Sequence, residues 1–192
     1  MKHLKSLLPL LLILLFPLSQ ETCQAQVFSK GSADLNLQIG FGTTYYLNST
    51  YSAGLPLLSA AVDYGLRDDW GPGVFGIGGI IGVHTLKHEP VDPDFGYKYT
   101  RVVLAPRATY HYQLLDKFDT YGGALLGLDI VSDNKYGDWT GEDAKSKAGV
   151  GAVFSIYIGA KMYVTDKFSI MTEFYAFDMA FFNLIIRSFF CF

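Results

Sequence analysis

Charged residues are scarce in this chain of 192 residues. They make up 17% of it, and 15 Lys plus Arg against 18 Asp plus Glu leave a formal net charge of -3. That balance excludes a basic nucleic-acid-binding protein and a charge-rich disordered tail. Long apolar runs are also missing from residues 26–192, where the longest has eleven residues, from Gly73 to Val83. A helix needs about 20 apolar residues to cross a bilayer, so helical spans are excluded in this part of the chain.

Cysteine is nearly absent, with two residues in the whole chain. Cys23 could carry a lipid anchor only if small apolar residues preceded it, and Gln20, Glu21 and Thr22 do not fit that pattern. If the N-terminal segment that includes Cys23 is removed as a signal peptide, as argued next, Cys191 is the one cysteine left. It can form no disulfide within the mature chain.

The N-terminal segment has the layout of a secretory signal. It begins with Lys2 and Lys5, continues through the apolar stretch Leu7–Leu18 and reaches the small residue Ala25. The apolar stretch of about 12 residues is too short to cross a hydrocarbon core of about 30 Å, which argues against a membrane anchor. We therefore predict a signal peptide over residues 1–25, cleaved after Ala25, and a single domain over residues 26–192.

The abundant residues are apolar and aromatic, and they alternate with polar ones. Hydrophobic residues make up 50% of the chain and aromatic residues 16%, with 20 Gly, 13 Tyr and 15 Phe. On one face of the alternating segments 31 of 33 positions are apolar, against 9 of 33 on the other face. A period of two residues predicts β-strands. Six segments show it: 33–41, 58–66, 75–83, 102–112, 124–130 and 148–162.

The polar face decides between an ordinary sheet and a membrane barrel. A solvated sheet face normally carries many long charged side chains, whereas glycine recurs here. A small barrel in lipid has an apolar exterior and a narrow interior of small and polar groups that satisfy one another. Two further segments, Phe168–Ala176 and Phe182–Phe192, bring the count to eight. We therefore predict an all-β fold, an eight-stranded antiparallel up-and-down transmembrane β-barrel.

The connections alternate between short and long. The short ones contain Asp, and the long ones are rich in Pro, Gly, Asp and Tyr, which predicts extracellular long loops and periplasmic termini. Tyr and Trp at the strand ends suit an interfacial belt. The short connections are Leu66–Gly73, Leu114–Asp119 and Val164–Lys167, and the long ones are Leu47–Gly54, Lys87–Gly96 and Ser132–Lys147.

Six charged residues have the inward parity of the predicted barrel. They are three acids and three bases, namely Asp63, Arg101, Arg107, Asp129, Lys161 and Glu173. Buried charges need partners, so near-balance predicts a mutually satisfied interior network. Strand pairing places Asp129 diagonal to Arg101 and Arg107, and Glu173 near Lys161. A gated ion path through the same polar column is the alternative, but eight strands leave an interior about filled by side chains.

The long loops are the candidate recognition surface. They present acidic and aromatic residues to the outside, namely Glu89, Asp92, Asp94, Tyr136 and Trp139. His88 and neighbouring carboxylates could attract a divalent cation, but loop carboxylates are more often solvated, and we expect no metal site and no cofactor.

Two other classes of function stay open. An outer-membrane enzyme that modifies lipid A would need a Ser nucleophile, a His base and a carboxylate within hydrogen-bond reach, and no matched Ser is evident near His84 or His111. A soluble secreted ligand-binding barrel would have the reverse faces, polar outside and apolar inside. Pro106 falls within a predicted strand and removes one ladder hydrogen bond, so we expect a β-bulge there.

Several stretches resemble the outer-membrane β-barrel domain family. They are ADLNLQIGFGTTYY at Ala33–Tyr46, YGLRDDWGPG at Tyr64–Gly73, YHYQLLDKFDTYGGALLGLDI at Tyr110–Ile130, and the terminal Phe192. Within that family the chain is similar to the small eight-stranded OmpA/OmpX-type barrels of Gram-negative envelopes. The resemblance implies insertion by the barrel-assembly machinery, which recognises a last strand ending in an aromatic residue. IIRSFFCF at Ile185–Phe192 departs from the family pattern in lacking the usual glycine and carrying Cys191.

Together these observations predict an integral outer-membrane β-barrel of a Gram-negative bacterium. Its interior is plugged by polar side chains, its role is structural or in surface recognition, and we expect no catalysis. Its expected partners are outer-membrane lipids, lipopolysaccharide and, through the C-terminal strand, the barrel-assembly machinery. We expect a monomer that binds no nucleic acid.

Overall fold

A computed structural model describes residues 28–41, 51–88, 96–137, 148–165 and 168–176, together with the backbone of residues 182–190. The predicted signal peptide and most of the predicted long loops lie outside the described residues. The described part forms nine strands: β1 (Ala33–Phe41), β2 (Tyr51–Ala53), β3 (Leu57–Arg67), β4 (Val74–His88), β5 (Gly96–Leu115), β6 (Phe118–Tyr136), β7 (Gly149–Thr165), β8 (Phe168–Ala176) and β9 (Phe182–Phe190). No helix among the described residues is long and apolar enough to cross a membrane.

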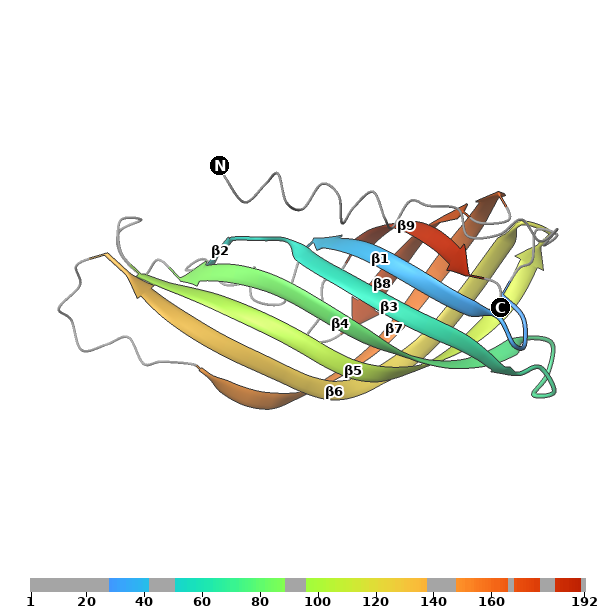
Figure 1. The fold of residues 1–192 in the computed structure, drawn as a ribbon, viewed down its shortest axis with the longest axis horizontal. Coiled ribbons are helices and arrows are strands. Elements are labelled where there is room, and N and C mark those ends of the chain that lie inside the picture. The colour runs from blue at the N-terminus through green and yellow to red at the C-terminus, as the bar shows by residue number, and fades with distance from the viewer. Residues whose placement is uncertain are drawn as a thin grey trace.

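The strands close into a ring. Their order is β2-β4-β3-β1-β9-β8-β7-β6-β5, and a further pairing between β4 and β5 joins the two sides of the sheet. Every pairing is antiparallel. If the short β2 is set aside, neighbours in the ring also follow one another in the chain, except where β1 pairs with β9 (Figure 1). This confirms the predicted antiparallel up-and-down barrel.

The short strand β2 belongs to the same barrel strand as β3. Both pair with β4, β2 opposite Leu86–His88 and β3 farther along. Between them the ladder is irregular: the Gly54 N–H donates to the Thr85 carbonyl at 3.0 Å, and the Thr85 N–H donates to the Leu55 carbonyl at 3.1 Å. Counting β2 with β3, the described residues form eight strands around the lumen.

The two faces of the strands differ as the alternation predicts. Outward side chains such as Leu37, Val62 and Ile158 are 48%, 48% and 67% exposed, although they are large and apolar. Inward side chains such as Arg107 and Lys161 are charged, yet 3% and 0% exposed. A soluble barrel with an apolar lumen would have the opposite arrangement, so the structure does not support that alternative.

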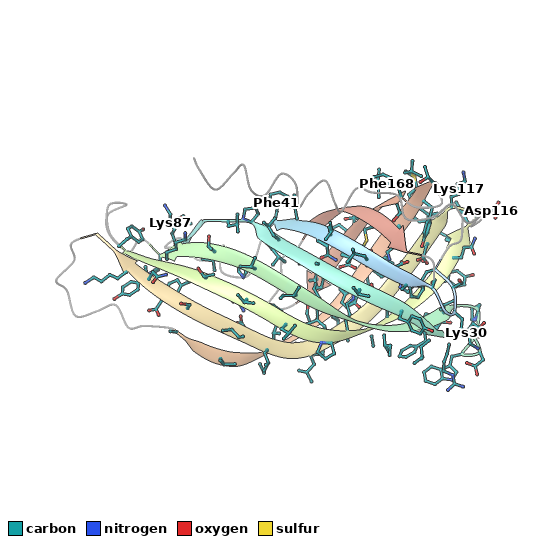
Figure 2. The ribbon with its side chains drawn as sticks, viewed as in Figure 1. Lys30, Phe41, Lys87, Asp116, Lys117 and Phe168 are labelled. Carbon is teal, nitrogen blue, oxygen red and sulfur yellow. The ribbon has the colours of Figure 1, made fainter. Side chains whose placement is uncertain are left out.

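The barrel has two unlike ends. At one end lie the short turns after β3 and β5 and the start of β1, and Figure 2 labels Lys30, Asp116 and Lys117 at this end, on the right. Toward the other end β4, β5 and β6, with 15, 20 and 19 residues, extend beyond the nine-residue β1, and they carry Lys87 (Figures 1 and 2). We call these the short-turn end and the long-loop end.

The bulge expected at Pro106 is not there. β5 keeps one register with β4 through Gly79 and Pro106, and its ladder with β6 stops after Leu104 and resumes at Arg107 in the same register. Proline therefore interrupts the pairing toward β6 without adding a residue, because the uninterrupted ladder with β4 holds the strand in place. The register shifts of the barrel lie near strand ends instead, at Gly65/Arg67, Gln113/Leu115 and Tyr163/Thr165.

Candidate functional site

Arg107 is the centre of the interior network. It projects inward from β5, its Nε lies 2.9 Å from Asp63 Oδ1, and its Nη2 lies 2.9 Å from Glu173 Oε1. All three side chains are fully buried. The guanidinium also lies 4.4 Å from the centroid of the Tyr157 ring. Because β3 and β8 lie on different sides of β5 in the ring, one side chain ties together three parts of the barrel wall.

The carboxylates bound by Arg107 have further donors. Asp63 Oδ2 accepts a hydrogen bond from Asn36 Nδ2 at 3.0 Å. Glu173 accepts hydrogen bonds from the hydroxyl of Tyr121 at 2.8 Å, from Gln38 Nε2 at 3.2 Å and from the hydroxyl of Tyr175. Buried charges need hydrogen bonds besides their ionic partners, and these neutral donors supply them to Asp63 Oδ2 and to Glu173.

A second group of charges lies toward the short-turn end. Lys161 Nζ lies 2.9 Å from Asp34 Oδ2, and both side chains are fully buried. His111 Nδ1 lies 2.6 Å from Asp119 Oδ2, also inside the barrel. Lys161 was expected near Glu173; instead it donates to Asp34, and Glu173 is bound by Arg107.

Asp34 and Asp119 are interior acids that the sequence analysis missed. Asp34 is a polar position in the apolar/polar alternation of 33–41, so the alternation of β1 already contained the signal. Asp119 was assigned to a turn, but the turn is shorter than expected and β6 already begins at Phe118. The interior therefore holds more acid than the predicted balance of three bases and three acids.

A third group of charges, the pair of Arg101 and Asp129, lies toward the long-loop end. Arg101 and Asp129 are linked by hydrogen bonds from Nε to both carboxylate oxygens at 3.1 Å and by a further one from Nη2. Their side chains are 4% and 13% exposed. The pair matches one of the two contacts expected for Asp129; the other expected partner, Arg107, is bound by Asp63 and Glu173.

The candidate recognition residues are mostly outside the described part of the chain. Glu89, Asp92, Asp94 and Trp139 fall in the undescribed loops, and Tyr136 ends β6 at the long-loop end. Lys87 Nζ lies 5.9 Å from the centroid of the Tyr136 ring, within range of a cation–π interaction. Within the described ranges no group of three or more His, Cys, Asp or Glu side chains is arranged to hold a metal ion.

Comparisons with known proteins return likenesses of structure only. No protein-family model and no curated protein matches the chain. The backbone structure of the Yersinia pestis outer membrane protein Ail in a phospholipid nanodisc has 13% identity, covers 84% of this chain and 100% of its own, and gives a TM-score of 0.47. The crystal structure of Ail, the attachment invasion locus protein of the same organism, has 9% identity, with 83% and 98% covered and a TM-score of 0.48.

A further crystal structure of Ail, in complex with the heparin analogue sucrose octasulfate, has 8% identity, covers 82% of this chain and 95% of its own, and gives a TM-score of 0.46. With TM-scores below 0.5, these likenesses carry no inference about what this chain binds. The proposals below rest on the geometry of the described residues.

Proposed function

We propose that this chain is an integral outer-membrane β-barrel of a Gram-negative bacterium, sealed by its interior network and active in a structural or surface-recognition role rather than in catalysis. The observation that carries the proposal is the pairing of an apolar exterior with an ionic interior in one closed barrel. Only lipid makes such an exterior favourable, because water would have to solvate a continuous belt of large apolar side chains.

The belt runs from β8 through β7, β6, β5, β4 and β3 to β1. The seven strands β1 and β3 through β8, whose side chains the structure describes, each contribute outward apolar residues that are 38% or more exposed. Each Å² of apolar surface removed from water contributes about 25 cal/mol, so contact of this belt with acyl chains is strongly favourable. We therefore place the middle of the barrel in the hydrocarbon core, the short-turn end with both termini in the periplasm, and the long-loop end outside the cell.

The buried network supports a sealed lumen. Arg107, Glu173, Tyr121 and Tyr175 fill the middle of the barrel and bind one another, and none is more than 4% exposed. A barrel of eight strands is just wide enough for its side chains, so this layer leaves no water-filled path. The expected role is therefore carried by the surface, where the extension of β4, β5 and β6 supports the undescribed loops.

The expected partners follow from this placement. Outer-membrane lipids surround the belt, lipopolysaccharide contacts the long-loop end, and the barrel-assembly machinery inserts the chain through its last strand. We propose that the barrel is a monomer, because its described strands close on themselves through the β4–β5 pairing, and a closed sheet needs no second chain to pair with. The signal peptide over residues 1–25 directs export and is cleaved.

The lipid A enzyme remains the second candidate because His111 and Asp119 form a histidine–carboxylate pair like those of general-base sites. Both side chains are buried inside the barrel, whereas a lipid A substrate would reach the outer surface. Release of fatty acid from lipid A by the purified protein in detergent would favour the enzyme, and no release is expected.

Two measurements test the proposal. Sodium carbonate extraction of membranes is expected to leave the protein in the pellet, and planar-bilayer recording of the purified protein is expected to show no large steady conductance. Release into the soluble fraction would contradict the membrane placement, and a large steady conductance would contradict the seal.

Deletion of residues 138–147 tests the recognition role, because it keeps β6 whole. Adhesion or phage sensitivity should fall, while the gel band of the folded barrel, which shifts only when the sample is boiled, persists.

A further inference from the structure

The residues before β1 fold back into the short-turn end of the barrel. Phe28 is 4% exposed, and its backbone N–H donates to the Tyr163 hydroxyl at 3.1 Å. Its ring stacks on the His111 imidazole, with ring centroids 3.9 Å apart and an interplanar angle of 25°. Phe28 therefore occupies an interior position although it belongs to no strand.

The stack continues into the barrel. On its other side His111 faces Tyr121, with centroids 4.7 Å apart and an interplanar angle of 18°. Lys161 Nζ lies 5.8 Å from the centroid of the Phe28 ring and 5.0 Å from that of Tyr121. A phenyl ring in this position thus gains stacking, cation–π attraction and burial together.

The barrel wall has room for this segment because two inward residues lack a side chain. A Cβ at Gly76 would lie 3.0 Å from Phe28 Cζ, and a Cβ at Gly65 would lie 2.0 Å from the Ser29 carbonyl oxygen. Gly65 also holds the segment by its backbone: its carbonyl accepts from the Gly31 N–H at 2.8 Å, and its N–H donates to the Ser32 carbonyl at 2.9 Å. The two glycines therefore leave space for the segment, and Gly65 also binds its backbone.

The segment covers a histidine that has an unused nitrogen. His111 is 2% exposed and its Nδ1 faces Asp119, but its Nε2 has no hydrogen-bond partner among the described groups. An imidazole backed by a carboxylate is a nucleophile and a base wherever a reagent can reach its free nitrogen. Phe28 stacks on one ring face and Tyr121 on the other, and the 2% exposure of His111 shows that a reagent in solvent does not reach the imidazole while Phe28 is docked.

We propose that the short-turn end of the barrel is a binding pocket for a phenyl side chain, filled in cis by Phe28, and that the segment Phe28–Ser32 is a lid over the pair of His111 and Asp119. The pocket is built from β5, β6 and β7, and Gly65 and Gly76 admit the lid. The lid goes beyond the seal described above, because the layer of Arg107 and Glu173 closes the lumen whether or not Phe28 is docked.

Chemical modification of histidine tests the lid directly. Diethyl pyrocarbonate transfers an ethoxycarbonyl group to an accessible neutral imidazole nitrogen, and mass spectrometry of peptides locates it. In the folded full chain in micelles, His111 should react far more slowly than the half-buried His88. Phe28→Ala should raise the rate at His111 by about tenfold or more, as expected when a local opening becomes easier.

Matched variants keep the test specific. Phe41→Ala removes an outward ring that is 55% exposed and should leave His111 protected. His84, 4% exposed and nearer the other end, should stay protected in every variant unless the barrel unfolds. Phe28→Leu keeps an apolar side chain in the pocket and should give an intermediate rate.

The outcomes separate the lid from the seal. A wild-type rate at His111 in folded Phe28→Ala would overturn the lid and leave the sealed barrel untouched. If Phe28→Ala does not fold, nuclear Overhauser contacts between the Phe28 and His111 rings in the wild-type chain decide the question: their presence supports the docked ring, and their absence refutes it.

Discussion

Replacing Arg107 by methionine is the most informative single perturbation of the interior. Methionine keeps the apolar length of the side chain but removes the guanidinium that lies 2.9 Å from both Asp63 and Glu173. Asp63 then retains the Asn36 amide, and Glu173 retains the hydroxyl of Tyr121 and other neutral donors. Two buried carboxylates would be left without a cation.

These contacts set the expected loss in the free energy of unfolding. Removing one partner of a buried ion pair costs about 3–5 kcal/mol, and Arg107 serves two carboxylates, so we expect the upper part of that range. The neutral donors that remain keep the loss from doubling. Adding Asp63→Asn and Glu173→Gln removes the uncompensated charges, and we expect this triple variant to recover about 2 kcal/mol or more.

Equilibrium unfolding by urea in lipid vesicles measures the free energy of unfolding. The folded fraction is read from gel migration, because the folded barrel shifts its band only when the sample is boiled. Arg67→Met is the matched control, since Arg67 pairs with Asp69 at 2.7 Å but both side chains are about half exposed, and the loss of stability should be far smaller than for Arg107→Met. A loss for Arg107→Met no larger than that of Arg67→Met would refute the network as the element that holds the lumen.

Two further predictions concern the wall of the barrel. Leu126→Arg places a charge on an outward side chain that is 62% exposed near the middle of β6, and it should cost about 2–4 kcal/mol in lipid by the same urea assay; a neutral effect would mean that this face meets water. Gly123→Ala should cost about 1–3 kcal/mol, because its Cβ would lie 2.1 Å from the Ala108 carbonyl oxygen. Gly151→Ala, whose Cβ meets nothing within 4 Å, should be tolerated; equal effects at the two glycines would contradict the close packing inside.

The fold could be predicted from the sequence because lipid imposes a simple rule on a barrel wall. Each outward position must be apolar, so the period of two residues identifies strands, their faces and, through the turns, their number. Leu37, Val62 and Ile158 all lie on the face that alternation assigns them. The same rule does not describe the inside, where size and partner matter more than polarity.

The partners inside the barrel could be predicted only in part. Arg101 and Asp129 are two positions out of register on adjacent strands, so strand pairing alone brings them together. The contact of Arg107 with Glu173 crosses the lumen, between strands that do not pair, and depends on barrel width and side-chain length. The same is true of Lys161, which finds Asp34 across the barrel rather than Glu173 on the neighbouring strand.

Phe28 shows a different limit. It precedes the first strand and has no periodic neighbours, so its sequence context indicates nothing about burial. The available signal was indirect: Gly65 and Gly76 are inward positions without side chains, next to the place where the chain enters the barrel. Glycine on an inward face can mark a site that another segment fills.

The adjacent leucines Leu125 and Leu126 allow the most direct test of which face meets lipid. They are 2% and 62% exposed on opposite faces of β6. With selectively labelled methyl groups in a lipid bilayer, we expect nuclear Overhauser contacts from acyl-chain protons to the Leu126 methyls and none to those of Leu125. Acyl contacts at Leu125 together with water contacts at Leu126 would contradict the account.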